Sequence, residues 1–404
     1  MIQTPKSLTL HIGIFGRTNV GKSTLVNYIT DQKTSIVSSV PGTTTDSVFK
    51  TMELLPIGPV TLIDTAGLDD KSMLAKERIE KTNHIFTMAD VAVIVAEANE
   101  WTEYEKNLMA ELSSRKTPVM ILVNNYKNIE LNNKFISEIS KYKYQVSSIA
   151  KGQRDAFLNE FKKIIFEITP DEILNNLPLT DVIIKKYQTV VLVVPIDLGA
   201  PKGRIILPQV QMIRAILDIN AIALIVKDSE LKQCLDNFKM PPDLVICDSQ
   251  VVKKVTDIVP KNIKVTTFSI IFTANRADIS EMMNGIEKIK NLKPGDKILI
   301  AEACTHHAST DDIGRIKIPN LVKKYLGFDV HFDVTAGQEY PKNIKDYALV
   351  IHCGGCMINK KQMVSRMNYA VENNVPVTNY GIVLSFVNGV LERVMEPFKS
   401  LILK

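Results

Sequence analysis

Short apolar runs alternate with stretches of helical periodicity along the first 168 residues of the chain. The runs that have the length and composition of buried β-strands are Leu8–Phe15, Val48–Leu55, Val60–Asp64, Val91–Ala96, Pro118–Val123 and Tyr144–Val146. Helical patterns follow most of them, and the helix Lys151–Ile168 closes the segment. This alternation predicts a mostly parallel, doubly wound sheet with helices on both faces.

The rest of the chain repeats this alternation in two further segments, which follow a stretch of helix breakers at 169–182. The elements predicted for residues 183–266 are strands at Val190–Pro195, Ala221–Val226 and Leu244–Cys247 and a helix at Pro208–Leu217. Those predicted for residues 267–404 are strands at Lys297–Ala301, Phe328–Val334, Ala348–Ile351 and Val375–Thr378 and helices at Ile318–Tyr325, Lys360–Asn373 and Gly381–Val390. We therefore expect an α/β protein with a doubly wound sheet at 1–168, a linker at 169–182, and two smaller parallel-sheet domains at 183–266 and 267–404.

Composition narrows the class of protein. A chain of 404 residues exceeds one ordinary core, and 45% hydrophobic with 23% charged residues is typical of a globular protein. The net charge of +5 is spread along the chain, which argues against nucleic-acid binding. No apolar run is long enough to cross a bilayer, and the first residues lack the apolar segment of a leader. The five cysteines are an odd number, so we expect reduced thiols in a cytoplasmic protein.

Residues 16–23 read G-x-x-x-x-G-K-S between a predicted strand and a predicted helix. The glycines of this motif let backbone N–H groups surround a phosphate, Lys22 meets the β- and γ-phosphate oxygens, and Ser23 offers its hydroxyl to Mg²⁺. The helix that follows directs its positive N-terminal end at the anion. The segment predicts a site for a nucleoside triphosphate and Mg²⁺.

Two further segments support this prediction. Residues 64–67, Asp-Thr-Ala-Gly, follow a predicted strand and supply Asp64 near Mg²⁺ and the Gly67 amide for the γ-phosphate. Residues 41–46 lie between the two motifs, where a mobile loop brings a threonine hydroxyl to Mg²⁺. The order of the three segments predicts a nucleotide hydrolase of the P-loop type.

These segments resemble the GTPases of the Era/TrmE group, whose loops read G-x-x-N-x-G-K-S and G-T-T-R-D. The resemblance implies GTP as the ligand, Thr44 as a second Mg²⁺ ligand beside Ser23, and Asn19 as the residue that holds K⁺ near the phosphates. Leu68 stands where Ras-like enzymes place a glutamine that orients water. Because leucine cannot orient water, we expect slow hydrolysis that depends on electrostatics, K⁺ and loop ordering. The predicted catalytic residues are Lys22, Ser23, Thr44, Asp64 and Gly67.

The base-recognition motif departs from this group. Residues 124–127 read Asn-Asn-Tyr-Lys where the group has Asn-Lys-x-Asp, whose aspartate accepts hydrogen bonds from guanine N1 and N2. Lys127 has no acceptor, although Asn128 offers an amide oxygen in a frame shifted by one. Residues 146–148 resemble the last base-binding motif, and we expect guanine selectivity to be weakened. The residues predicted to contact the nucleotide are Arg17, Thr18, Asn19, Val20, Gly21, Lys22, Ser23, Thr24, Thr44, Asp64, Gly67, Asn124, Asn125, Ser147 and Ser148.

Cysteine motifs follow two predicted strands near the C-terminus. Residues 302–306 read Glu-Ala-Cys-Thr-His, and residues 352–356 read His-Cys-Gly-Gly-Cys. Both motifs lie at carboxyl ends of strands in one expected parallel sheet, where distant residues converge. Three thiolates with two glycines predict an iron–sulfur cluster on Cys304, Cys353 and Cys356. A zinc site with three cysteines and one histidine is the main chemical alternative.

The order of a GTPase domain, Cys-x-His and His-Cys-x-x-Cys resembles the HydF family of [FeFe]-hydrogenase maturation GTPases. Residues 200–209 and 248–250 are also similar to that family. The resemblance implies a GTPase domain, a dimerisation domain and a cluster domain, with a [4Fe–4S] cluster on the three cysteines. It implies that the protein carries a diiron precursor to apo-[FeFe]-hydrogenase after radical-SAM maturases load it. A homodimer or a higher oligomer follows from the same likeness, helped by a strand at Val190–Val194 that we expect to be exposed.

Three cysteines leave one iron of such a cluster without a thiolate. Glu302, His352 and His306 are the candidates for the fourth ligand, and the sequence does not rank them. Cys234 and Cys247 lie in apolar patterns and are expected to be small core residues. The alternative function is that of an RNA-associated Era/TrmE-like GTPase with a structural zinc, which predicts a basic stripe or a GXXG module that the sequence lacks.

Overall fold

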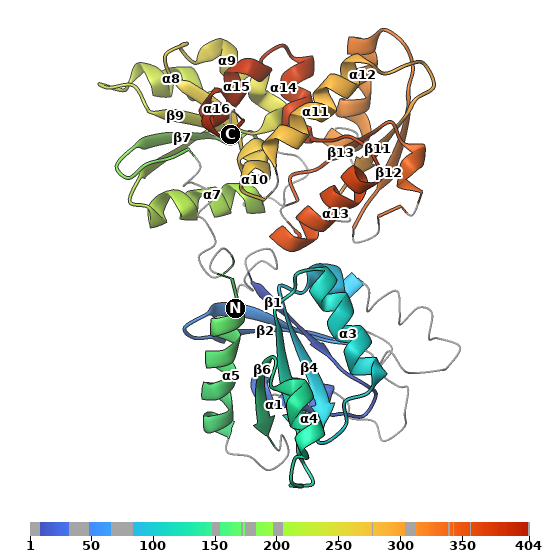
Figure 1. Ribbon diagram of the computed structural model, residues 1–404. Coiled ribbons are helices and arrows are strands. Elements are labelled where there is room, and N and C mark those ends of the chain that lie inside the picture. Colours follow the sequence, from blue (N-terminus) through green and yellow to red (C-terminus); the bar gives the residue numbers. More distant parts are fainter. Residues whose placement is uncertain are drawn as a thin grey trace. The chain divides into compact units, whose positions relative to one another are not determined.

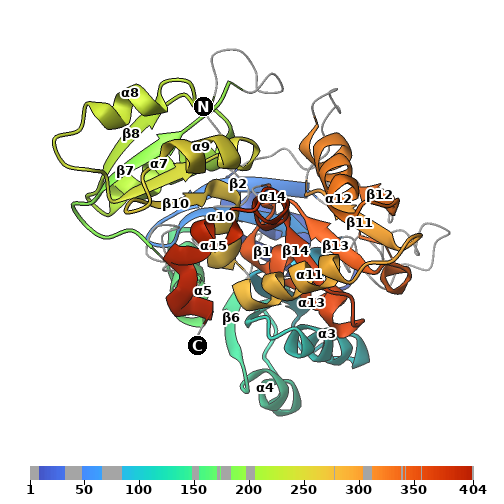
Figure 2. The same cartoon turned by 90° about the horizontal axis from the view of Figure 1, so that it is seen from above.

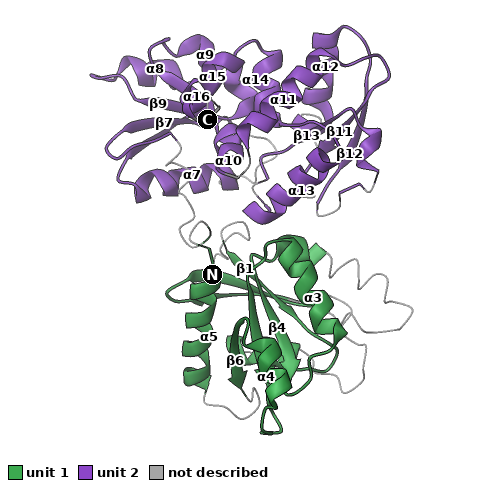
Figure 3. Ribbon diagram, viewed as in Figure 1, with its two compact units in different colours: residues 1–176 green, residues 177–404 purple. Residues whose placement is uncertain are grey.

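The computed structural model describes residues 9–31, 48–65, 84–147, 154–170, 173, 183–196, 205–276, 278–303, 312–337, 340–341, 343–355 and 357–402. The chain forms two compact units, residues 1–176 and 177–404 (Figure 3). Most of the predicted linker at 169–182 lies outside the described residues. In the described part of the chain, no helix combines the length and the apolar character needed to cross a membrane.

Unit 1 is built on a six-stranded sheet in the order β2-β3-β1-β4-β5-β6 (Figure 1). Its strands are β1 (Leu10–Phe15), β2 (Val48–Leu54), β3 (Gly58–Asp64), β4 (Val91–Glu97), β5 (Val119–Asn124) and β6 (Lys143–Ser147). Its helices are α1 (Lys22–Thr30), α3 (Glu103–Ser114), α4 (Asn133–Ile139) and α5 (Arg154–Ile168). Only β2 and β3 pair antiparallel, so the expected doubly wound α/β sheet is confirmed.

Alternation along the strands of unit 1 places the helices on opposite faces of the sheet. Ile12 and Ile14 of β1 pack in one core with residues of α1 and α5. The next residue, Phe15, packs on the other face in a core with residues of α3. Because successive side chains of a strand point to opposite faces, both faces need apolar residues, and β4 is buried from Val91 to Ala96.

Unit 2 contains two four-stranded parallel sheets (Figure 2). The first has the order β10-β9-β7-β8, with β7 (Thr189–Val193), β8 (Ile222–Val226), β9 (Leu244–Cys247) and β10 (Lys264–Thr267). The second has the order β12-β11-β13-β14, with β11 (Lys297–Ala301), β12 (His331–Thr335), β13 (Leu349–His352) and β14 (Val377–Asn379). The two parallel sheets expected from the sequence are therefore present.

The helices of unit 2 cover these sheets and fill the space between them. They are α7 (Leu207–Asp218), α8 (Leu231–Asp236), α9 (Val252–Ile258), α10 (Phe268–Arg276), α11 (Ile279–Lys290), α12 (Ile318–Leu326), α13 (Lys360–Glu372), α14 (Tyr380–Val387), α15 (Leu391–Met395) and α16 (Lys399–Ile402). Figures 1 and 2 show α10 and α14 between the two sheets. The side chains of both sheets belong to one continuous core. The predicted domain boundary at residue 266 stays a prediction.

The expectation that Val190–Val194 forms an exposed strand is wrong. β7 lies between β9 and β8 in the sheet, and Val190–Val193 are fully buried. An interior parallel strand is covered on both faces and therefore reads as an unbroken apolar run. The exposed strand is β8 at the edge of this sheet, where Ile222 is 58% exposed, Leu224 39% and Ile225 46%.

The two cysteines expected in the core of unit 2 have different surroundings. Cys247 is fully buried in β9, whereas Cys234 of α8 is partly buried and packs against the core. Both are free thiols, as is Cys353.

Candidate nucleotide-binding and metal sites

The phosphate-binding loop begins where β1 ends. Gly16 has φ 143°, and a Cβ there would lie 2.4 Å from the backbone oxygen of Val95, so no larger residue fits. Gly21 has φ 101° and precedes the first residue of α1, Lys22. The two glycines thus form the turn that directs the N-terminus of α1 at the loop.

The ammonium of Lys22 lies inside this loop. Its Nζ donates to the backbone oxygens of Gly16 at 2.7 Å and Arg17 at 2.6 Å, and the residue is 6% exposed. A cation held by carbonyls at a helix N-terminus is a strong donor for a phosphate oxygen. The geometry fits the role predicted for Lys22.

Ser23 and Asp64 meet beside Lys22. Ser23 Oγ donates to Asp64 Oδ2 at 2.5 Å, and Asp64 Oδ1 is buried without a hydrogen-bond partner in the part of the chain that the structure describes. Burial raises the pKa of Asp64, and the Ser23 hydrogen bond and the charge of Lys22 oppose that rise. Mg²⁺ prefers oxygen ligands and retains several of its waters. A buried carboxylate that has one oxygen without a hydrogen-bond partner and lies next to a hydroxyl therefore suits this ion. The residues present therefore fit this ion.

Arg17 connects the loop to α3. Its Nε donates to Glu105 Oε1 at 2.8 Å, and its Nη2 lies 2.5 Å from Glu100 Oε2. The other oxygen of Glu105 accepts from the backbone and hydroxyl of Thr102, which caps α3. The guanidinium of Arg17 thus faces two protein carboxylates. The Thr102-x-x-Glu105 capping motif is the local sequence signal for the start of α3.

The other predicted loop residues lie at the surface to different degrees. Asn19 is exposed with φ 66°, a left-handed conformation that asparagine tolerates, and Thr24 is exposed on the first turn of α1. Thr18 is half-buried, and Val20 is buried. Their side chains stay predicted contacts.

The residues of the base motif lie at the ends of β5 and β6. Asn124 is buried, and its Nδ2 donates to the backbone oxygen of Val20 at 2.9 Å, which joins β5 to the phosphate loop. The backbone N–H of Asn125 donates to the oxygen of Ser147 at 2.9 Å, which joins β5 to β6. Three segments predicted to bind the nucleotide are therefore brought together.

The cysteine motifs begin at adjacent strand ends of unit 2. β11 and β13 pair in parallel with Ala301 opposite His352. The backbone N–H of Ala303 donates to Cys353 Sγ at 3.1 Å. Burial raises the pKa of the Cys353 thiol, and hydrogen bonds from the backbone of Gly355 and Ala303 oppose that rise. Amides that face a cysteine sulfur stabilise a thiolate, which is the form that binds iron.

Glu302 is held by residues that the sequence analysis missed. It is 2% exposed, and its Oε2 accepts from Arg315 Nη2 at 3.0 Å while Oε1 accepts from the Tyr380 hydroxyl at 3.4 Å. Arg315 lies in a π-helical turn, Ile313–Lys317, and a Cβ on Gly314 would lie 2.1 Å from the Tyr380 hydroxyl. Glycine lets this turn approach Glu302. No local sequence signal links Glu302 with Arg315, because the chain between them gives no pattern for the contact.

His352 has both ring nitrogens engaged. Nδ1 lies 2.7 Å from the backbone oxygen of Cys353, so it donates, and Nε2 lies 3.4 Å from Arg366 Nη1, so it accepts. Burial and the charge of Arg366 lower the pKa of His352 to about 3, so the ring is neutral. Arg366 is itself buried, with Nη2 donating to the oxygen of Gly337 and its guanidinium 5.5 Å from the ring centre of Tyr340.

Several predicted site residues lie outside the described residues: Thr44, Gly67, Ser148, Cys304, His306 and Cys356. Within the described ranges, no group of three or more histidine, cysteine or acidic residues is arranged to hold a metal ion. The three-cysteine cluster and its zinc alternative therefore stay predictions. What the structure contributes is the geometry around Cys353 and Glu302.

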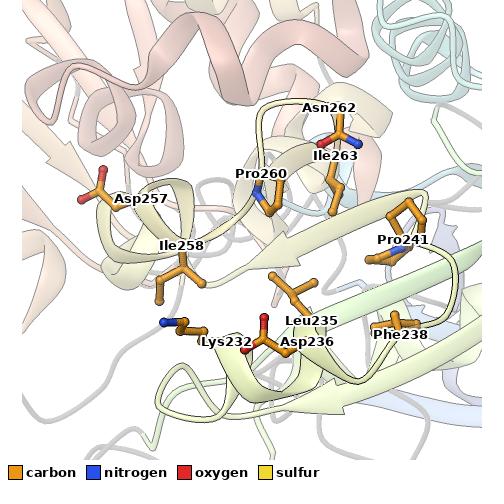
Figure 4. Close-up of a pocket in the computed structure, with 11 residues that line it drawn as sticks. Lys232, Leu235, Asp236, Phe238, Pro241, Asp257, Ile258, Pro260, Asn262 and Ile263 are labelled. Carbon is orange, nitrogen blue, oxygen red and sulfur yellow. The ribbon is translucent and has the colours of Figure 1, made fainter.

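A cavity of about 490 Å³ lies in unit 2, away from these residues (Figure 4). Its lining comes from α8, α9 and the segments that follow each of them, with Leu235 and Ile258 among its apolar residues. Lys232, Asp236 and Asp257 supply its charged groups. No residue predicted to bind nucleotide or metal lines this cavity.

Three family models match the chain. Residues 280–397 match the Hydrogen maturase F tetramerization domain and residues 179–277 the Hydrogen maturase F dimerization domain. Between them these two models cover more than half of the chain. Residues 11–125 match a family described as 50S ribosome-binding GTPase.

Curated relatives match only the N-terminal part. The GTPase Der of Clostridium perfringens is 37% identical over 138 residues, which are 33% of this chain and 31% of that protein. The tRNA modification GTPase MnmE of Lactobacillus gasseri is 30% identical over 161 residues, 39% of this chain and 34% of that protein. The chain thus spans about a third of the length of these relatives.

Solved structures of GTPases also match. Era of Aquifex aeolicus matches with 18% identity and a TM-score of 0.35, over 54% of this chain and 92% of that one. The G domain of the FeoB iron transporter of T. maritima matches with 22% identity and a TM-score of 0.30, over 40% of this chain and 99% of that one. The sequence matches and the P-loop geometry together identify unit 1 as a GTPase domain.

Proposed function

Because the chain belongs to the hydrogen maturase F family, we propose that it is a GTP-hydrolysing scaffold in the maturation of [FeFe]-hydrogenase. It holds a [4Fe–4S] cluster through Cys304, Cys353 and Cys356. It receives a diiron precursor from radical-SAM maturases and delivers this precursor to the apo-hydrogenase. These steps take place in the cytoplasm.

The hydrogen bond from the Ala303 N–H to Cys353 Sγ carries the cluster proposal. Ala303 directly precedes Cys304, and Gly355, whose backbone also bonds the Cys353 sulfur, directly precedes Cys356. Consecutive Cα atoms are only about 3.8 Å apart, so each of these two backbone groups is one residue away from the next cysteine of its motif. When bound, the cluster supplies an iron whose fourth ligand position exchanges.

Glu302 and His352 both stay candidates for the fourth ligand. The carboxylate of Glu302 accepts hydrogen bonds from Arg315 and Tyr380. The neutral ring of His352 has one acceptor nitrogen, and Arg366 occupies it. His306, outside the described residues, stays an alternative.

In the GTPase domain, Lys22 and the loop amides bind the phosphates, Ser23 and Thr44 hold Mg²⁺, and Asp64 lies next to the ion. Nucleotide binding orders the loop at residues 42–46 and shifts the affinity for partners. Such a switch requires only a few kcal/mol of differential binding. Lys22 and the Mg²⁺ site neutralise the charge that develops on the phosphates. The leucine at position 68 has no polar group with which to orient the attacking water.

Anaerobic reconstitution of the full chain with iron and sulfide tests the proposal. We expect about four irons and four sulfides per chain and a broad brown absorption. A colourless protein that binds zinc in a one-to-one ratio contradicts the cluster and leaves a structural zinc site in its place.

Potassium is proposed to stimulate hydrolysis through Asn19. Its exposed side chain stands on the phosphate loop, where an amide oxygen can bind a cation next to the nucleotide. We expect faster GTP turnover in K⁺ than in Na⁺ at equal ionic strength, and we expect Asn19→Ala to remove the difference. Equal rates of the unchanged protein in the two salts would exclude this role.

The dimer is proposed to form along β8. In the described part of the chain this strand lies at the edge of its sheet, where a further strand can pair with it, and it exposes Ile222, Leu224 and Ile225. We expect Leu224→Lys to convert the dimer into a monomer at micromolar concentration, measured by light scattering after size exclusion. Met240→Lys, at a position 79% exposed in the loop after α8, serves as the control and is expected to remain dimeric. A dimeric Leu224→Lys protein would place the interface elsewhere.

A further inference from the structure

A trio of polar side chains, those of Glu97, Tyr126 and Lys127, lies at the carboxyl ends of β4 and β5. Lys127 Nζ is 2.7 Å from Glu97 Oε1, and the Tyr126 hydroxyl donates to the same oxygen at 3.1 Å. The ammonium of Lys127 also lies 5.1 Å from the ring centre of Tyr126. These contacts hold the ammonium in place.

The trio belongs to the nucleotide-binding edge of the sheet. β4 lies between β1, which leads into the phosphate loop, and β5, which leads into the base loop. Asn124 ties the end of β5 to Val20 of the phosphate loop, and Asn125 ties it to Ser147. Ligands of open parallel sheets bind at the carboxyl ends of the strands, so the base lies beside this loop.

The side-chain amide of Asn125 is used within the base loop. Asn125 Oδ1 accepts from the backbone N–H of Ile129 at 3.0 Å, and Asn125 Nδ2 donates to the oxygen of Ile129 at 2.8 Å. The hydrogen bond from Lys127 lowers the pKa of Glu97, and the same bond raises the pKa of Lys127. Both side chains are therefore charged at neutral pH, and Lys127 is a donor without acceptor capacity.

We propose that Lys127 is a specificity-determining residue that makes this site indifferent to the 2-amino group of a guanine nucleoside triphosphate. Guanine presents N–H donors at N1 and at its 2-amino group. A site that bonds the 2-amino group needs an acceptor there, and Lys127 supplies a second donor instead. GTP and its analogue ITP, which lacks the 2-amino group, are then used alike. This inference rests on the proposed nucleotide hydrolysis and is independent of the cluster.

The test compares kcat/KM of the full chain for Mg·GTP and Mg·ITP. We expect the two values to agree within about threefold, whereas a carboxylate that accepts from the 2-amino group separates them by roughly 10- to 100-fold. The variant Lys127→Asp combined with Glu97→Gln places an acceptor at this position without a facing negative charge. It is expected to prefer GTP by at least about tenfold.

A matched control combines Lys127→Met with Glu97→Gln, which removes the cation without adding an acceptor, and its GTP to ITP ratio is expected to stay near one. A wild-type preference for GTP of tenfold or more overturns the proposal, whatever the variants do. So does an aspartate variant that hydrolyses ITP but shows no preference for GTP. A wild-type chain that hydrolyses neither nucleotide overturns the hydrolase itself, and this inference falls with it.

Discussion

Replacing Lys22 by alanine is expected to lower kcat for GTP hydrolysis by on the order of 10²- to 10³-fold. The ammonium of Lys22 is buried in the phosphate loop and held by two backbone oxygens. Its loss removes a charge-assisted contact that strengthens as the phosphates develop negative charge. Phosphate release under saturating Mg·GTP measures the effect.

The matched control for this variant is Lys106→Ala. Lys106 lies on α3 in the same unit and pairs with Glu103 at the surface, where an ion pair contributes little. We expect its kcat to equal that of the unchanged protein. Turnover that persists in Lys22→Ala would show that the phosphate site has been assigned to the wrong residues.

Replacing Cys353 by serine is expected to lower the iron content after anaerobic reconstitution from about four per chain to less than about one. Serine keeps an acceptor for the Ala303 N–H, so the loop retains its hydrogen bond while the thiolate ligand is lost. The reduced protein should also lose the electron paramagnetic resonance signal of the cluster. Iron analysis and that spectrum are independent readouts.

Cys234→Ser provides the control for this second variant. Cys234 is a free thiol in α8, partly buried and distant in sequence from both cysteine motifs. It should retain the full iron content and the unchanged spectrum. If the Cys353→Ser protein also kept its full iron content and its spectrum, Cys353 would not be a ligand, and the cluster proposal would be contradicted.

The phosphate-binding loop shows how much of a site can be predicted from sequence. The spacing of Gly16, Gly21 and Lys22 requires backbone conformations that few other residues adopt, so the local pattern already implies the geometry. Ser23 and Asp64, both expected near Mg²⁺, are hydrogen-bonded to each other. By contrast, the ion pairs of Arg17 with Glu100 and Glu105 were not expected.

The arrangement of unit 2 shows that sequence patterns do not predict the order of strands in a sheet. β7 and β8 are both short apolar runs, and the pattern alone suggested that β7 was exposed, whereas β8 is the edge strand. Strand order is decided by which elements pack around the sheet, and periodicity carries no information about that choice. Helix α11 was not predicted, although its N-cap Asp278, which accepts a hydrogen bond from the backbone N–H of Ser280, is a local signal for it.

The sequence by itself determined the elements and motifs that depend on neighbouring residues: the α/β alternation, the phosphate loop, the departure at Lys127, and the two cysteine motifs at strand ends. Only the tertiary structure decided the long-range partners: Arg315 and Tyr380 on Glu302, Arg366 on His352, and Glu97 on Lys127. The physical reason is that backbone conformation is set by local sterics and hydrogen bonding, which short patterns record. Contacts between distant segments depend on how whole elements pack into one core, and a short pattern does not record that packing.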